Sequence, residues 1–585
     1  MLGLTPWVSL VIVVVVAALV RLVPRSGRLR GRPIAFARQF AHGPSLPLLV
    51  GLATGVATLW VWGSLARTAV VHDESAYLLQ AQLFAKWRFT APTPPLYHFF
   101  EQLYVNLVPA ISSKYPPGTS LLIAPGVRFG YPGLPIVAAN ALSGALVFLL
   151  ARRIAGVVVA MLTWALWVSS FPVLYFHAMY LSEVPTSLAW LATWWGIARW
   201  RTSGRTRDLA IAALAIAYCG ITRPLTAVAL AVAVGIVMLR VRRTTSPRFR
   251  RAELVTLGSA AALALLFVGI WSWRSTGNPT LTPLTLYTRT YVPFDRLGFG
   301  ARAEDAPSAS LPWDQQVTDR AFYEEHQRHT VAHLPVAAFS RARMIGRDMW
   351  YDWRGGLALV ALLGLAGAPI ELWVGLGALA LQLLLYLLYA HPPTWSLYYI
   401  EGLPVLAFAT ALGVPVLLSL GTRGRAPAVA RLVAGAALFL MLLYPAWVTM
   451  HQVRDQISAD HSYYDAFLGS LPPLPDSTST AIVFVRYSKA HNDGLSLVRN
   501  VPDLASEAIW VAYDRGAENA KLMSIAPDRV PYLFDEARWA LHRLNKDGSV
   551  ARERAVVRDS TAAPDSAAVR DSASMKDSTV VQNTR

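Results

Sequence analysis

Cysteine is almost absent from this chain of 585 residues, and so are the common signatures of a metal or nucleotide site. The single cysteine, Cys219, lies in an apolar run, so a disulfide within the chain and a thiolate metal cluster are both excluded. There is no dense cluster of aspartates. A P-loop and a G-x-G-x-x-G after a strand are also missing, so nucleotide-driven chemistry has no support.

Charged residues are scarce as well, at 15% of the chain, and they are unevenly signed. Lysine and arginine total 53 against 35 acidic residues, which gives a net charge of +18. Most of this charge is arginine in short segments between apolar runs, as in the cytoplasmic loops of membrane proteins. Because the basic groups are spread over loop ends, we do not expect nucleic acid as a partner.

Apolar residues are abundant, at 54% of the chain. Runs of roughly 20 residues, the length that crosses ~30 Å of hydrocarbon, recur as far as Met450. We therefore predict a polytopic α-helical membrane protein with about twelve spans and with both termini on the external face. The predicted spans are residues 4–23, 46–69, 133–151, 155–175, 183–198, 208–222, 224–240, 253–272, 355–370, 372–390, 398–419 and 430–450.

Changes in composition divide the chain into four predicted parts. Two apolar segments after the last span, 481–487 and 509–514, read as buried strands, and the region after Val556 has almost no large apolar side chains to form a core. The parts are 1–45, an N-terminal span and basic cytoplasmic loop; 46–450, a transmembrane domain with external loops 71–132 and 273–354; 451–550, a small extracytoplasmic α/β domain; and 551–585, a disordered tail. In the first external loop, Ser75 to Trp87 is predicted to be an amphipathic helix on the membrane surface.

An acidic pair, Asp73 and Glu74, directly follows the second predicted span in the sequence HDESAY. A carboxylate beside the bilayer can accept a proton from an attacking hydroxyl, and general-base help of this kind is typically worth about 10²–10⁴-fold. Asp at a helix start can instead cap the helix by accepting backbone N–H bonds. The two roles are compatible for Asp73, and capping does not need two acids, so we predict a catalytic role for the pair.

A basic residue, Lys114, lies later in the same loop, in SKYPPG. Almost all other basic residues are arginines, and a compact ammonium suits a phosphate group as a point charge. The following prolines restrict the backbone around it. The alternative is a lysine that snorkels at the membrane interface.

Further polar residues lie at the predicted external ends of other spans. Arg223 lies in the turn Thr222-Arg223-Pro224, where it could bind a phosphate leaving group or a lipid headgroup. Glu183 in SEVP and Glu401 in YYIEGLP could bind a sugar hydroxyl or only pair with an arginine. Weaker candidates for substrate contacts are His98, Glu101, Tyr115 and His391. The sequence supports no cofactor, but it leaves open a divalent-ion site formed by Asp73 or Glu74 together with loop 273–354.

Several of these motifs resemble those of one family. DESAYLLQAQLFAKWRF (73–89) followed by HFFEQL (98–103) and SKYPPG (113–118) resembles the first external loop of bacterial GT-C glycosyltransferases. These polytopic enzymes include protein O-mannosyltransferases, the lipid A aminoarabinose transferase and RgtA/B/C/D-like members. STGNPTLTPLTLY (275–287) and the TRP turn are also similar to segments of such proteins. The resemblance covers most of residues 46–410.

This resemblance implies an inverting transfer of a sugar from a polyprenyl-phosphate donor to an acceptor on the external face. It implies that Asp73 is the base with Glu74 as its neighbour, and that Lys114, with Arg223, contacts the lipid phosphate. The expected partners are that donor, a lipid, glycan or protein acceptor, and the lipids of a bacterial-type inner or plasma membrane. A transporter or flippase of lipid-linked glycans is the main alternative, although such proteins place polar groups near the bilayer midplane. A noncatalytic assembly subunit is a third reading.

Overall fold

A computed structural model of the protein describes residues 7–20, 39, 42–245, 251–308, 311–419, 428–491, 494–500, 502–545 and 547–551. The chain forms two compact units that are each assembled from separate stretches of sequence. The helical unit comprises Met1–Leu65, Gly133–Leu266 and Val331–Arg454, and the mixed unit comprises Ala66–Pro132, Phe267–Thr330 and Asp455–Arg585. The tail predicted to be disordered lies, apart from Ala551, outside the described residues.

A helix occupies each of the predicted spans within the described residues. These helices are α1 (Val8–Val20), α3 (Ser45–Trp62), α6 (Leu134–Ala155), α7 (Val157–Val168), α9 (Glu183–Ser203), α10 (Thr206–Gly220), α11 (Pro224–Thr245), α12 (Arg251–Thr276), α16 (Leu357–Leu365), α17 (Ile370–Tyr386), α18 (Leu403–Ser419) and α19 (Ala428–Ser470). Other elements of the helical unit are α8 (Phe171–Phe176), η4 (Val331–His333), α15 (Leu334–Trp350), η5 (Asp352–Arg354) and η6 (Ser396–Gly402).

Six helical segments of the described chain are long and apolar enough to cross a membrane. They are α3, α6, α11, α12, α19 and the continuous segment of η6 and α18, while α7 and α17 are apolar but shorter. The protein is thus predominantly helical with several membrane-type helices, as predicted. The number of about twelve crossings stays a prediction.

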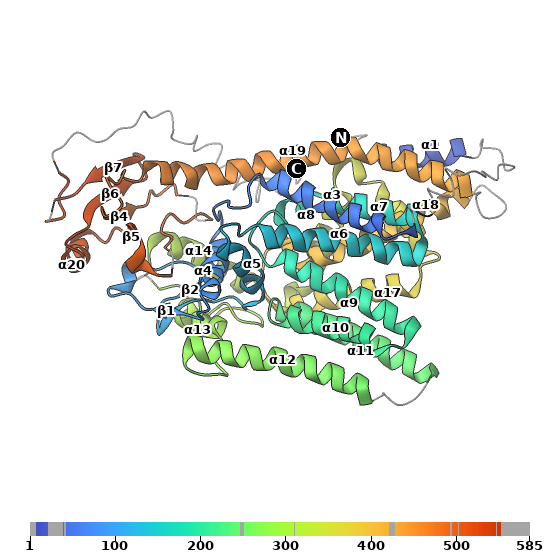
Figure 1. Ribbon diagram of the computed structural model, residues 1–585, viewed down its shortest axis with the longest axis horizontal. Coiled ribbons are helices and arrows are strands. Elements are labelled where there is room, and N and C mark those ends of the chain that lie inside the picture. The colour runs from blue at the N-terminus through green and yellow to red at the C-terminus, as the bar shows by residue number, and fades with distance from the viewer. Residues whose placement is uncertain are drawn as a thin grey trace. The chain divides into compact units, whose positions relative to one another are not determined.

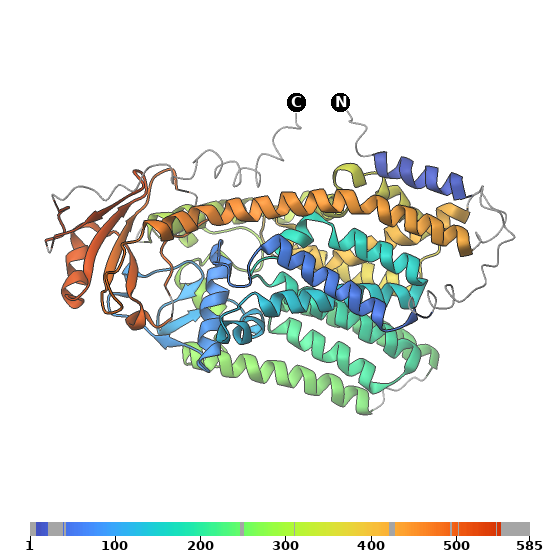
Figure 2. The ribbon, with the colours of Figure 1, turned by 45° about the horizontal axis from the view of Figure 1, so that its top comes forward.

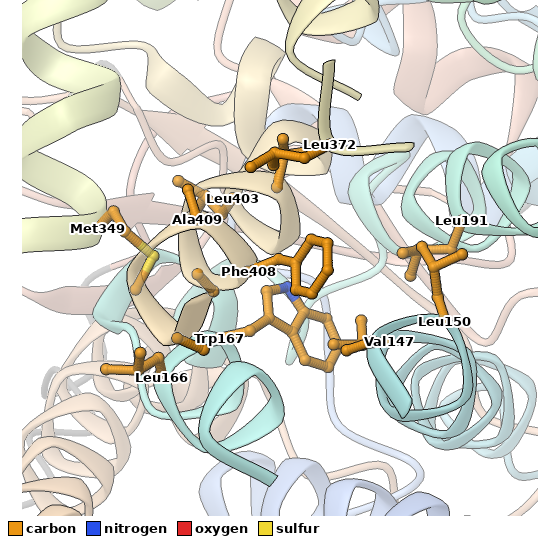
Figure 3. Close-up of a cluster of buried hydrophobic side chains, with 14 of the residues drawn as sticks. Val147, Leu150, Leu166, Trp167, Leu191, Met349, Leu372, Leu403, Phe408 and Ala409 are labelled. Carbon is orange, nitrogen blue, oxygen red and sulfur yellow. The ribbon is translucent and has the colours of Figure 1, made fainter. Parts of the chain in front are cut away.

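Close packing in the helical unit depends on small residues. Helices α9, α10 and α11 lie side by side (Figure 1). In the contact of α16 with α18, a Cβ on Gly413 would lie 1.8 Å from the carbonyl oxygen of Val360. Glycine therefore lets these two backbones approach closely, as small residues do at helix interfaces in membranes. Trp167 of α7 and Phe408 of α18 lie within the main apolar cluster (Figure 3).

The mixed unit begins with α4 (His72–Ala85), the helix predicted for the first external loop. The prediction that this helix lies on a membrane surface is wrong, because residues around its whole circumference are buried, Gln80 and Ala81 completely. After it come β1 (Ala91–Pro92), η2 (Tyr97–Phe99), β2 (Val105–Asn106), β3 (Ala110–Ser113) and α5 (Gly118–Arg128). The three strands form an antiparallel sheet in the order β1-β3-β2, with Val105 opposite Ser113.

The second predicted loop also folds into helices. In the mixed unit these are α13 (Pro283–Thr290), η3 (Ala303–Asp305) and α14 (Trp313–Arg328). Threonine and proline start α13, because the Thr282 side chain accepts the N–H of Thr285 and Pro283 needs no partner at the first helical position.

The C-terminal part of the mixed unit contains a four-stranded sheet in the order β5-β4-β6-β7 (Figure 2). Its elements are β4 (Ala481–Arg486), η7 (Leu504–Ser506), β5 (Ile509–Tyr513), η8 (Gly516–Glu518), α20 (Asn519–Ile525), β6 (Val530–Asp535) and β7 (Ala540–Arg543). Strands β4, β5 and β6 are parallel, and β7 is antiparallel to β6. The two predicted strands are present as β4 and β5. The division of 451–550 as a separate domain stays a prediction.

Candidate active site

The acidic pair at the start of α4 divides into two different environments. Glu74 is 1% exposed, and its Oε2 accepts the backbone N–H groups of Val70 (2.8 Å) and Val71 (3.2 Å). Glu74 therefore caps the helix, a role that the sequence had suggested for Asp73. The Asp73 carboxylate is partly exposed and accepts the hydroxyl of Tyr115 at 2.5 Å. Asp73 is thus the acid of the pair that can meet a substrate.

Lys114 lies in a cage of three tyrosine rings. Its Nζ is 3.9 Å from the ring centroid of Tyr104, 5.0 Å from that of Tyr287 and 5.2 Å from that of Tyr115. The residue is 6% exposed, and no described group lies within hydrogen-bond distance of Nζ. Its ion-pair partner is Asp295, whose Oδ2 is 3.9 Å away. The ammonium is therefore held in place mainly by ring faces and keeps its three N–H donors for a ligand.

Acidic side chains surround this lysine. Burial lowers the pKa of Lys114, and the negative charges of Asp295, Asp73 and Asp319 act in the opposite direction. The imidazole of His326 also lies against this group, with Nε2 3.5 Å from Oδ1 of Asp295.

Asp319 of α14 is the least satisfied member of this group. It is 1% exposed, and neither carboxylate oxygen accepts a hydrogen bond from the described residues. Burial raises the pKa of Asp319 to about 7, with Lys114 opposing the rise and Asp295 and Asp314 adding to it. Asp319 is therefore protonated in a substantial fraction of molecules near neutral pH, which limits the negative charge around Lys114.

Contacts between distant segments hold the cage together. The Gln80 side chain of α4 accepts the N–H of Ser113 at 3.1 Å, which fixes the strand that leads into Lys114. The N–H of Tyr104 donates to the hydroxyl of Tyr287 at 3.1 Å. The Asn106 amide donates to the carbonyl oxygen of Pro283 at 3.0 Å. The motif STGNPTLTPLTLY is thus brought directly against residues 71–132.

Three sequence-predicted residues of the helical unit also come together. Arg223 donates to Oε1 of Glu183 (2.5 Å) and Oε1 of Glu401 (3.1 Å), and it donates further to the hydroxyl of Ser182 and the carbonyl of Leu397. All three charged groups are buried, at 7%, 1% and 0% exposure respectively. The geometry shows the arginine pairing that the sequence left open for both glutamates. A role for Arg223 at a phosphate stays a prediction.

The weaker candidates have several different surroundings. His98 and Glu101 gather around Arg515, which donates to the carbonyl of His98 (2.7 Å) and to Oε2 of Glu101 (3.0 Å). Burial raises the pKa of Glu101 to about 7, and Arg515 opposes the rise. His391 belongs to the helical unit, is 1% exposed and lies 3.0 Å from the Tyr399 hydroxyl. Of the four weaker candidates, Tyr115 directly contacts Asp73.

Sequence reasoning missed Tyr104, Tyr287 and Asp319 as site residues. Tyr287 ends the motif STGNPTLTPLTLY, so a search of that motif for aromatic residues could have found it. Asp319 lies in an ordinary polar helix and gives no local signal. Among the described residues, no group of three or more His, Cys, Asp or Glu side chains is placed to hold a metal ion.

Comparisons with known proteins find similarity among solved structures. ArnT from Cupriavidus metallidurans bound to undecaprenyl phosphate is 13% identical with a TM-score of 0.46, over 85% of this chain and 91% of that one. Its apo form is 14% identical with a TM-score of 0.44, over 83% and 88%. The arabinosyltransferase EmbB from Mycobacterium smegmatis is 14% identical with a TM-score of 0.36, over 80% and 44%.

ArnT and EmbB are GT-C glycosyltransferases, the family that the external-loop motifs resemble. No family model and no curated protein matches the chain. A structural likeness at this level carries no functional argument, so the proposal below rests on the geometry of the site.

Proposed function

We propose that this protein is a membrane glycosyltransferase that moves a sugar from a polyprenyl-phosphate-linked donor to an acceptor on the extracytoplasmic face. The transfer inverts the anomeric carbon, and the membrane is a bacterial-type inner or plasma membrane. One observation supports this most strongly: Tyr115 joins a partly exposed carboxylate to a caged ammonium, by its hydroxyl to Asp73 and by its ring to Lys114. The proposed reaction uses no nucleotide or other cofactor.

In the proposed reaction, Asp73 accepts a proton and Lys114 binds the leaving phosphate. An acceptor hydroxyl attacks the anomeric carbon while its proton passes to the carboxylate of Asp73. The bond between that carbon and the phosphate oxygen breaks, and polyprenyl phosphate leaves as an anion. Lys114 donates hydrogen bonds to the departing oxygens, where low dielectric makes a fixed cation effective. The partial protonation of Asp319 limits the negative charge that would repel this anion.

The test is transfer of radiolabelled sugar from polyprenyl-phosphate donors in proteoliposomes, with Asp73→Asn and Lys114→Ala compared with wild type. We expect Asp73→Asn to lose about 10²–10⁴-fold in rate and Lys114→Ala about 10²–10³-fold. Matched controls are Asp528→Asn and Lys521→Ala, which change exposed residues of the same unit and should transfer sugar like wild type.

Wild-type rates in Asp73→Asn would remove Asp73 as the base. Movement of labelled lipid across the bilayer without release of polyprenyl phosphate would instead identify a flippase. Folding of every variant is checked by its elution as a single species and by its unfolding temperature.

A further inference from the structure

A cavity of about 310 Å³ lies in the mixed unit, at the carboxyl ends of the parallel strands β4 and β5. Open sheets with parallel strands bind ligands at this edge, where the loops of neighbouring strands diverge. Here β5 and β6 lie on opposite sides of β4, and the cavity lies at the β4–β5 pair. Its lining residues are Leu311, Pro312, Trp313, Val485, Arg486, Tyr487, Tyr513, Asp514 and Arg515.

Three aromatic residues, Trp313, Tyr487 and Tyr513, line the cavity. The Tyr487 hydroxyl accepts the N–H groups of Leu497 (2.8 Å) and Val498 (3.2 Å), and the Tyr513 hydroxyl donates to Asp314 (3.0 Å). Both hydroxyls are therefore engaged inside the protein, and of the two rings Tyr487 is the more exposed. Trp313 is 38% exposed, an unusual position for so large an apolar side chain.

The Tyr487 and Trp313 rings are backed by a fixed imidazole. His491 lies 4.3 Å from the Tyr487 ring and 6.3 Å from the Trp313 ring, centroid to centroid. Glu536 holds it through a 2.7 Å contact of Oε1 with Nδ1. Rigid aromatic walls of this kind need little reorganisation when a ligand binds.

Each arginine at the cavity is paired with a carboxylate. Arg486 donates to Oδ2 of Asp514 at 2.7 Å, and Arg515 donates to Oε2 of Glu101 at 3.0 Å. Each guanidinium thus has a carboxylate partner, which disfavours a polyanion as the ligand. The remaining N–H edges and ring faces suit a neutral molecule that carries many hydroxyl groups on an apolar frame.

We propose that this cavity binds a neutral saccharide unit of the acceptor glycan. The acceptor role rests on the glycosyltransferase function proposed above, whereas saccharide binding does not. Helix α14 connects the two places: Trp313 at its start lines the cavity, Asp314 beside it bonds Tyr513, and Asp319 interacts with Lys114. The six residue steps from Trp313 to Asp319 rise about 9 Å along the helix, so a glycan held here would extend toward the transfer site within a few sugar units.

Saccharide binding is tested with the full chain in phosphatidylcholine nanodiscs, which avoids the sugar headgroups of maltoside detergents. A printed array of neutral and anionic oligosaccharides is the probe, followed by calorimetric Kd values for the best ligand. Trp313→Ala and Arg486→Ala should each weaken binding at least ten-fold. Matched controls are Trp87→Ala, which removes a tryptophan that is 90% exposed, and Arg538→Ala, which removes an exposed arginine that pairs with Asp535.

No donor lipid is present in this assay, so it reports on the cavity whether or not the chain transfers sugar. Three outcomes would overturn the proposal. They are an array with no bound saccharide, a preference for anionic glycans or anionic vesicles, and unchanged Kd values in both variants. In transfer assays, both variants should raise the acceptor KM at least ten-fold. Saccharide binding with an unchanged acceptor KM would refute the acceptor role.

Discussion

Asp319→Asn tests the electrostatics of the proposed site through the pH dependence of stability. Burial raises the pKa of Asp319 from 3.8 to about 7. Because the folded pKa lies above the unfolded one, the folded state holds the proton more tightly. The resulting stability is fully present below pH 3.8 and is lost as the pH rises through about 7. A difference of this size corresponds to about 4 kcal/mol across that range, at 1.36 kcal/mol per pKa unit.

Asparagine cannot ionise, so this loss of stability should be absent from Asp319→Asn. The unfolding temperature of wild type should fall between pH 5 and pH 8 relative to that of the variant. Between pH 5 and pH 8 about 2.6 kcal/mol of this stability is lost, which for a unit of this size corresponds to a shift of roughly 5 °C. The measurement is tryptophan fluorescence during heating in nanodiscs, with Asp528→Asn as the exposed control. If the unfolding temperatures of Asp319→Asn and wild type changed with pH in the same way, Asp319 would not be a buried carboxylate with a raised pKa.

Three further predictions concern single contacts. Tyr115→Phe removes the hydrogen bond to the Asp73 carboxylate and should lower the transfer rate about ten-fold at unchanged donor KM, as kinetics would show. Arg223→Ala leaves two buried glutamates without their cation, so the free energy of unfolding should fall by about 3–5 kcal/mol in denaturant titrations. Gly413→Ala places a methyl group 1.8 Å from a backbone oxygen and should lower the free energy of unfolding by about 1–3 kcal/mol. A Cβ at Gly377 would meet no neighbouring segment within 4 Å, so Gly377→Ala should be neutral or slightly stabilising by the same measurement.

The parts of the site that could be predicted from the sequence are those that a short segment defines by itself. Asp73 and Glu74 stand next to each other at the end of an apolar run, and Lys114 stands before two prolines, so both attracted attention without any tertiary information. Helix positions were predictable for the same reason, since membrane-length apolar runs are local.

The cage around Lys114 could not be predicted, because it is assembled across long stretches of chain. Tyr104 and Tyr287 are 183 positions apart, and their contact depends on how α13 packs against β2. The burial of Asp319 likewise depends on this packing, since the sequence of α14 gives equal prominence to several polar residues. The sequence also could not show which acid caps α4, because either Asp73 or Glu74 could have accepted the backbone N–H groups at its start.

The bare ammonium of Lys114 has a consequence for the speed of turnover. Among the described residues, Nζ makes no hydrogen bond that an arriving phosphate would have to break. Water has already been removed from most of this side chain during folding, so in the proposed reaction that cost is not met again when a donor lipid binds. In the proposed reaction, release should also be easy, since the departing phosphate leaves Lys114 among ring faces and with Asp295 still 3.9 Å away. A cage of tyrosines thus lets one cation serve repeatedly without rearrangement of its surroundings.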